Sequence, residues 1–365
     1  MNNGKVTNDE VKQKAIEIIQ KAARKFRVPM YAVTASQFWA CANDNVTDWQ
    51  MRKIGSFTRV RNTEFPVPPG AEKVEQSQTY KKFIGRISNL SNFNCHNVPI
   101  EELFKISGVK KSTVFKMLVI PDMHIDEHDE YALCALLKFV QKYKPHGVIN
   151  LGDFMEMDAV THWPAPDARP RRLTPQILKA RKILTTIDDA CGPQCKFKKF
   201  LMGNHEDWLN QYLVGNIPEA LFELDQLGVD LRFQELLGLK DFGYDTIPLN
   251  EILKIGEHSH FIHGYYTNKH HAAKHLDVFG VNIYYGHLHD IQHHSTVSVN
   301  GVHEAASLGC LRKLNAPFLR GKPNNWSHAF GIFEYTFDGF YTRYTPVIIN
   351  GKFSYNGEVF DGTKL

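Results

Sequence analysis

Five short apolar runs in the last two thirds of the chain are each followed by polar residues. They span residues 117–120, 147–151, 197–202, 260–262 and 281–285. Apolar runs of this length, bounded by turn residues, are typical of buried strands. Helical patterns lie between several of the runs, and this alternation predicts an α/β domain that begins at residue 115.

The polar residues after these runs are of the types that bind metal ions. They are Asp122, His124, Asp153, Asn204, His205, His263, His287 and His289. Open α/β sheets bind their ligands outside the carboxyl ends of the strands, so we expect these side chains to meet at one site. Carboxylate, amide oxygen and neutral imidazole suit divalent ions such as Mn²⁺, Fe²⁺ or Zn²⁺. If the strands continued through their motifs, Asp122 and His124 would point to one side and hold one ion, and so would His287 and His289.

The order of these motifs resembles that of a known enzyme family. The strings D-M-H, G-D, G-N-H-E-D, H-G and G-H-L-H stand in the order of the five motifs of calcineurin-like metallophosphoesterases, over residues 115–345. The resemblance implies a four-layer α/β/β/α sandwich, two divalent metal ions with Mn²⁺ preferred, and hydrolysis of phosphoric esters. It assigns Asp122, His124 and His289 to the first ion, Asn204, His263 and His287 to the second, and Asp153 to both.

The same resemblance implies how the reaction proceeds. Two adjacent ions would acidify a water molecule for attack on phosphorus. His205 would then donate a proton to the leaving oxygen. An acidic partner is expected to orient His205, and Glu156 and Asp158 are the two candidates. In protein Ser/Thr phosphatases of this family, an Arg-Gly pair follows the second aspartate of the motif that contains the bridging aspartate. The corresponding string here, G-D-F-M-E-M-D, is not followed by that pair, which weakens the interpretation as a phosphoprotein phosphatase.

The amino-terminal third of the chain is basic. Residues 1–116 contain 19 Lys and Arg against 10 Asp and Glu, whereas the remainder contains 24 against 29. This asymmetry indicates a polyanionic partner. Thr7 and Glu10 form a capping-box pattern before apolar residues at helical spacing, which predicts an amphipathic helix over 7–27. We divide the chain into a basic helical domain (1–66), a linker with a helical segment (67–114) and a catalytic domain (115–365).

Within the basic domain, one segment resembles a DNA-binding repeat. Residues 34–61 are similar to the small helical repeats associated with homing endonucleases. The similarity lies in the strings T-A-S-Q-F-W and V-T-D-W-Q-M-R-K-I-G-S-F-T-R-V-R. A DNA-binding repeat joined to a metallophosphoesterase domain resembles a phage arrangement. The resemblance implies a helix-turn-helix-like unit that contacts DNA through Arg52, Lys53, Arg59 and Arg61. The alternative is a basic helical cap. Residues 100–116 also have a helix-turn-helix pattern, but the strand at 117–120 leaves room only for a truncated helical pair.

Together these features favour hydrolysis of a phosphodiester in DNA. One alternative is a phosphatase or phosphodiesterase that acts on small nucleotides or phosphoproteins, and another is a DNA-binding protein with a regulatory metal site. Arg169, Arg171 and Arg172 are a second candidate set of phosphate-binding residues. Residues 1–27 do not resemble a signal peptide and no run of about 18 apolar residues occurs, so we expect a cytoplasmic protein without a membrane partner, in the host cell if a phage encodes it.

Overall fold

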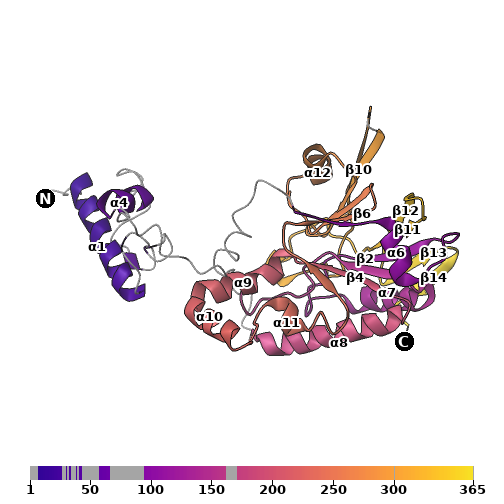
Figure 1. Cartoon of the computed structure of the whole chain (residues 1–365), viewed down its shortest axis with the longest axis horizontal. Helices are drawn as coiled ribbons and strands as arrows, with labels where there is room; N and C mark the ends of the chain where they lie inside the picture. Colours follow the sequence, from indigo (N-terminus) through magenta and orange to yellow (C-terminus); the bar gives the residue numbers. More distant parts are fainter. Residues whose placement is uncertain are drawn as a thin grey trace. The chain divides into compact units, whose positions relative to one another are not determined.

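Two compact units make up the chain, residues Met1–Ser91 and Asn92–Leu365. They are seen in a computed structural model (Figure 1), which describes residues 7–26, 30, 33, 38, 41–42, 57–65, 94–161, 171–299 and 301–364. Two of the predicted DNA-contacting residues, Arg52 and Lys53, lie outside the described residues. Most of the predicted linker (67–114) also lies outside them.

The first unit contains the helices α1 (Asn8–Phe26) and α4 (Phe57–Glu64). The predicted capping box begins α1, since Thr7 N–H donates to Glu10 Oε2 at 2.7 Å and Glu10 N–H donates to Thr7 Oγ1 at 3.2 Å. The buried side chains of α1 are Val11, Ala15, Ile18, Ile19, Ala22 and Ala23. They form one core with Val60 of α4, so the amphipathic helix predicted over 7–27 is confirmed.

The second unit is built on two six-stranded sheets. The first sheet contains, in spatial order, β1 (Cys95–Val98), β6 (Ile252–Ile255), β7 (Ser259–Ile262), β8 (Ile283–Tyr285), β10 (Gly301–Ser307) and β9 (His293–Ser298). The second contains β12 (Tyr341–Tyr344), β11 (Gly331–Tyr335), β2 (Phe115–Ile120), β3 (Gly147–Asn150), β4 (Phe197–Leu201) and β5 (Asp245–Ile247). All five apolar runs of the sequence are therefore strands.

Alternation along the strands creates the layers. In β2, Leu118 and Ile120 pack in the same core as the helices α7 (Glu130–Tyr143) and α8 (Leu173–Cys191). Met117 and Val119 point to the other face and share a core with residues of the first sheet. The outer face of the first sheet packs against α12 (His271–Phe279). Figure 1 shows α12 beside the first sheet and α7 and α8 beside the second, so the expected α/β/β/α sandwich is confirmed.

The remaining elements lie outside the two sheets. They are α6 (Ile100–Ser107), α9 (Asn204–Asn216), α10 (Pro218–Gln226), α11 (Phe233–Leu237), the 3₁₀ helix η3 (Pro317–Leu319), β13 (Lys352–Tyr355) and β14 (Glu358–Asp361). The carboxyl-terminal hairpins extend the second sheet only through β11 and β12, because β13 and β14 pair with each other alone. Among the described residues, no helix is both long and apolar enough to cross a membrane.

The unit boundary differs from the expected start of the catalytic domain at residue 115. The strand β1 pairs in parallel with β6, and Leu103 and Phe104 of α6 lie in the core between the sheets. Residues 94–114 therefore belong to the second unit. One helix, not a helical pair, precedes β2, because Gly108 ends α6 in a left-handed conformation (φ 71°) and a turn follows.

Candidate metal centre

The polar residues at the strand ends converge from both sheets. Asp122 and Asp153 follow the parallel neighbours β2 and β3, and Asn204 begins α9 directly after β4. From the facing sheet, His263 follows β7 and His287 follows β8, which is its parallel neighbour. Because the carboxyl ends of parallel neighbours meet at one edge, each sheet delivers its polar side chains to the same place.

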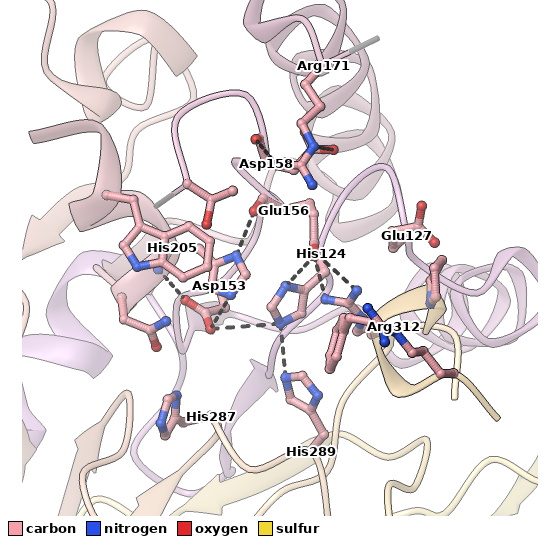
Figure 2. A pocket seen from close by; sticks show the side chains of 16 residues that line it. His124, Glu127, Asp153, Glu156, Asp158, Arg171, His205, His287, His289 and Arg312 are labelled. Atoms are coloured by element: carbon pink, nitrogen blue, oxygen red, sulfur yellow. Dashed lines mark hydrogen bonds and ion pairs between the residues drawn. The ribbon is translucent and has the colours of Figure 1, made fainter. Parts of the chain in front are cut away.

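The side chains form two groups that share one carboxylate. One group is Asp122, His124, Asp153 and His289, and the other is Asp153, His263 and His287; within each group the candidate ligand atoms lie within 4.8 Å of one another. Asn204 joins the second group, since its Oδ1 lies 3.0 Å from His263 Nε2. Figure 2 shows Asp153 amid His124, His205, His287 and His289. These groups could hold metal ions, and they match the two ligand sets that the family resemblance implies.

The backbone brings these ligands together by turning sharply. His124, Asp153, His287 and His289 all have positive φ angles, of 50°, 47°, 68° and 64°. Left-handed conformations are unfavourable for residues other than glycine and gather at functional sites. Extended strands therefore do not continue through the motifs. The prediction that His287 and His289 share one ion is wrong, since they belong to different groups, whereas Asp122 and His124 lie in one group as predicted.

Two glycines make room for the carboxylates. A Cβ atom at Gly286 would overlap the carboxylate of Asp122, and one at Gly203 would overlap Asp153. His287 N–H donates to both carboxylate oxygens of Asp122, at 2.8 and 2.9 Å. The glycines therefore let the loop after β8 and the start of α9 approach the two acidic residues closely.

The imidazoles of the site are in a state that suits a metal ligand. Burial, assisted by the positive charge of Arg312, holds the pKa of His124 well below its usual range. Burial and the neighbouring His263 lower the pKa of His287 to about 4. The buried Nδ1 atoms of His287 and His289 have no hydrogen-bond partner among the described residues. Neutral imidazoles with an available lone pair fit a divalent ion such as Mn²⁺, Fe²⁺ or Zn²⁺.

His263 is the exception, because without metal it forms an ion pair. Its Nε2 lies 3.3 Å from Asp153 Oδ2 and its Nδ1 lies 2.8 Å from the carbonyl oxygen of Leu151. Although burial opposes the charged form, Asp153 raises the pKa of His263 to about 10. Burial likewise opposes the charge of Asp153, but His263 and His205 hold its pKa well below the usual range. A metal ion at this group would have to displace the proton of His263.

We therefore expect metal binding at the second group to release about one proton at pH 7–8 and to strengthen about tenfold per pH unit over that range. The sign follows from the raised pKa of His263: its ion pair stabilises the metal-free protein fully below about pH 6.5 and is lost as pH rises through about 10. Titration calorimetry in buffers of different ionisation enthalpy measures the released proton. His263→Gln should abolish the release, and an unchanged release in that variant would contradict the assignment.

His205 belongs to neither of these two groups, although it forms a third group with His124 and Glu156 whose candidate ligand atoms also lie within 4.8 Å of one another. Its Nδ1 lies 2.6 Å from the carbonyl oxygen of Glu156, to which it donates, and its backbone N–H donates to Asp153 Oδ1 at 2.9 Å. The Trp208 ring lies against the imidazole, with a centroid distance of 3.8 Å. The prediction that Glu156 or Asp158 orients His205 through its carboxylate is therefore wrong. The hydrogen-bond acceptor for Nδ1 is the backbone carbonyl oxygen of Glu156. With Nδ1 engaged, Nε2 remains as the atom that can carry a transferable proton.

The Glu156 carboxylate has another place, which sequence reasoning missed. Its Oε2 lies 2.9 Å from His124 Nδ1, and both carboxylate oxygens accept hydrogen bonds from the buried guanidinium of Arg312. The Asp158 carboxylate instead contacts Gln176 and Arg171. Nothing near Arg312 in the sequence marks it, because it follows β10 and is 156 residues from Glu156.

Glu206 was also missed, although a local signal exists. Its buried carboxylate accepts backbone N–H bonds from Gly203 (2.8 Å), Asp153 (2.8 Å), Phe154 (2.9 Å) and Met155 (3.3 Å). Burial and the nearby Asp153 raise its pKa to about 7. A Glu three residues after the glycine that precedes a helix is the pattern that could have identified it. Glu206 therefore fixes the loop that carries Asp153.

A cavity of about 570 Å³ opens over the ligands. Its described lining includes His124, Asp153, Asn204, His205, His287, His289, Glu127, Glu156, Asp158, Thr161, Arg171, Trp208, Arg312, Pro317, Phe318 and Arg320. Of the three arginines considered as alternative phosphate-binding residues, Arg171 lines the cavity and Arg169 lies outside the described residues. This volume is in the range of small-molecule sites.

The four residues predicted to contact DNA belong to the first unit, whereas the ligand groups belong to the second. Arg61 donates from its guanidinium to the carbonyl oxygen of Val33 at 2.8 Å and to Asn62 Oδ1 at 3.0–3.1 Å. Arg59 is exposed on α4. Arg52 and Lys53 are not among the described residues. Arg61 therefore also contributes to the packing of α4.

No family model matches the sequence. The chain is 25% identical over 267 residues to the Gene 54 protein of Mycobacterium phage D29, and 26% identical over 268 residues to that of Mycobacterium phage L5; each match covers 67% of this chain and 98% of the relative.

Two solved structures of Vps29 from Entamoeba histolytica are also similar. A single mutant matches with a TM-score of 0.36 and 13% identity, covering 67% of this chain and 98% of Vps29. The wild type complexed with Zn²⁺ matches with a TM-score of 0.35 and 14% identity, covering 68% and 99%.

Proposed function

We propose that this chain is a calcineurin-like metallophosphoesterase that uses two divalent metal ions, with Mn²⁺ preferred, to hydrolyse a phosphodiester bond of DNA. One observation carries the proposal: side chains from five strand ends form two ligand groups that share Asp153. A shared carboxylate between two sets of imidazole ligands is the arrangement that suits a two-metal hydrolase. As a phosphoric ester hydrolase it would belong to class EC 3.1.

When bound, the two ions would supply an acidified water and neutralise the charge that develops on the phosphate oxygens. The chain supplies the rest. With its Nδ1–H donated to the Glu156 carbonyl oxygen, His205 presents Nε2 as the atom from which a proton would pass to the leaving oxygen. Glu156, held by Arg312, lies against His124 Nδ1 and limits the orientations of that ligand.

The DNA substrate is supported by the basic amino-terminal third and by its repeat-like strings, which would bring a polyanion to the catalytic unit. Similarity to two mycobacteriophage proteins supports a phage gene product that acts in the cytoplasm of the host cell.

A phosphodiesterase for small nucleotides is the second candidate, and the modest volume of the cavity favours it. A DNA-binding protein with a regulatory metal site fits less well. A regulatory metal site does not require a proton donor, yet His205 is oriented by a carbonyl oxygen and lines the cavity. It also does not require every ligand of both sets, yet all of them are present.

A substrate panel tests the proposal. Purified protein with Mn²⁺ should hydrolyse bis(4-nitrophenyl) phosphate and DNA, and a chelator should abolish both activities. Activity on the small ester without activity on any DNA would favour the small-nucleotide alternative. Binding of DNA with no hydrolysis of either substrate in the presence of Mn²⁺, Fe²⁺ or Zn²⁺ would favour the regulatory site.

Replacement of Arg52, Lys53, Arg59 and Arg61 by Gln is expected to weaken DNA binding and to reduce its dependence on salt. Each lost phosphate contact lowers the slope of log affinity against log salt by about 0.7 for single strands and 0.9 for duplex DNA, so four contacts change it by roughly 3 to 4. Fluorescence anisotropy at several salt concentrations measures the slope.

The matched control changes four cations to Gln, namely Lys14, Lys21, Arg24 and Lys25, which are exposed on α1 of the same unit. An equal change in the control would show a general charge effect and would contradict specific contacts. Thermal unfolding must accompany the measurement, because Arg61 also bonds to Val33. A shortened chain for comparison should begin at Asn92, since a cut near residue 110 would remove β1 and α6 from the second unit.

A further inference from the structure

The loop of residues 315–322 (N-A-P-F-L-R-G-K) forms one wall of the cavity above the candidate metal ligands. It includes the short helix η3, and Pro317, Phe318 and Arg320 line the cavity. The Phe318 side chain is 50% exposed. A large aromatic ring left half in solvent at the mouth of a site is available for stacking with a ligand.

Arg320 differs from the other arginines of the cavity in its lack of a partner. Arg312 is bound to Glu156, and Arg171 lies beside Asp158. The guanidinium of Arg320 makes no hydrogen bond or ion pair with any described residue, and its backbone is left-handed (φ 50°). Among the described lining residues, Arg320 therefore offers a positive charge that no neighbouring carboxylate neutralises.

The loop is fixed relative to the metal ligands by contacts at its base. The Arg312 guanidinium lies 5.1 Å from the centroid of the Phe318 ring, and the Trp326 ring packs against Phe318 at 5.8 Å. Trp326 in turn lies 4.5 Å from the ring of His289. The Phe318 ring is therefore held at a defined position beside the ligand groups.

An aromatic ring next to an unpaired cation suits a nucleotide, whose base can stack while its phosphate binds the cation. The site restricts which form of DNA can use both. Asp122, His124 and Asp153 are at most 1% exposed and lie beneath the cavity. In a duplex the bases are stacked and paired inside, so no base reaches Phe318 unless it leaves the stack. An unpaired strand meets this requirement without that cost.

We propose that Phe318 and Arg320 bind the nucleotide next to the scissile phosphate, with its base on Phe318 and its phosphate on Arg320, and that the substrate is unpaired DNA. This inference rests on the proposed function and specifies the substrate of the same site.

The first test compares two replacements of Phe318. The measured quantity is kcat/KM for a thymidine oligomer divided by kcat/KM for bis(4-nitrophenyl) phosphate. Phe318→Leu should lower this ratio about 5- to 100-fold, because it removes the stacking of one base. Phe318→Trp should restore the ratio, because it returns an aromatic face. A ratio that Phe318→Leu leaves at the wild-type value would overturn the stacking role.

The second test uses two cations of the same loop. The ammonium group of Lys322 also makes no hydrogen bond or ion pair with any described residue, but Lys322 does not line the cavity. Arg320→Ala should reduce the slope of log kcat/KM against log salt by about 0.7 on the thymidine oligomer. Lys322→Ala should leave the slope and both activities unchanged. Equal effects of the two variants would reduce Arg320 to general surface charge and overturn its phosphate contact.

The third test concerns the form of the DNA. The unpaired oligomer should be hydrolysed at least about tenfold faster than the same strand within a blunt duplex, since a paired base must leave the stack before it can reach Phe318. Equal rates would overturn the inference while the proposed function stood. Absence of metal-dependent hydrolysis of the small ester in the wild type would instead be a failure of the proposed function.

Discussion

The Asp153→Asn variant is expected to lose hydrolysis of every phosphate ester by several orders of magnitude and to hold fewer than two metal ions per chain. Asp153 is the residue common to both ligand groups, and its Oδ2 lies 3.3 Å from His263 Nε2 and 3.8 Å from His124 Nε2. An amide has no charge to offset two adjacent cations. It also has only one acceptor oxygen, so if that oxygen accepts the backbone N–H of His205, an N–H₂ donor faces the imidazoles in place of Oδ2.

Metal analysis and turnover together measure this effect. Asp207→Asn is the matched control, because Asp207 lies on the same helix as Asn204 and its carboxylate accepts hydrogen bonds, among the described residues, only from Asn210 and Gln211. The control should keep both ions and full activity. An Asp153→Asn protein with two ions and near wild-type turnover would show that the groups sharing Asp153 are not the catalytic centre.

His205→Ala is expected to keep its metal ions and to lose about 10²- to 10⁴-fold in kcat on a substrate with a poor leaving group. The imidazole is proposed to deliver a proton from Nε2, whereas the backbone N–H that donates to Asp153 remains in the alanine variant. A nitrophenolate leaves without protonation, so the loss on a nitrophenyl ester should be much smaller.

The comparison of two leaving groups decides the role of His205. His258→Ala serves as the control, since His258 is exposed next to β7 and lines neither the cavity nor a ligand group. An equal loss on both leaving groups would show that His205 acts on the metal site or on the fold and not as a proton donor. A loss of metal in the variant would lead to the same conclusion.

Local patterns were sufficient to predict the strands, the first helix and the candidate ligands. The five apolar runs are strands because alternate residues of each must be buried on two faces, which Leu118 and Met117 of β2 illustrate. The capping box of Thr7 and Glu10 involves residues three apart and forms as its letters suggest. The candidate ligands could also be identified from the residue types that follow each strand, because parallel strands bring their carboxyl ends together regardless of the conformation of the loops.

Contacts between distant residues were decided only by the tertiary structure. The sequence offered Glu156 and Asp158 as partners of His205, but a loop with Asp153 and Met157 at positive φ presents the Glu156 carbonyl oxygen instead, and the carboxylate meets His124 and Arg312. The pairing of β1 with β6 joins segments more than 150 residues apart, and Phe318 and Arg320 reach the cavity through a loop without a motif. The physical reason is the same in each case: hydrophobic periodicity and capping depend on neighbours in the chain, whereas these contacts depend on loop conformations that packing selects among many with similar local energy.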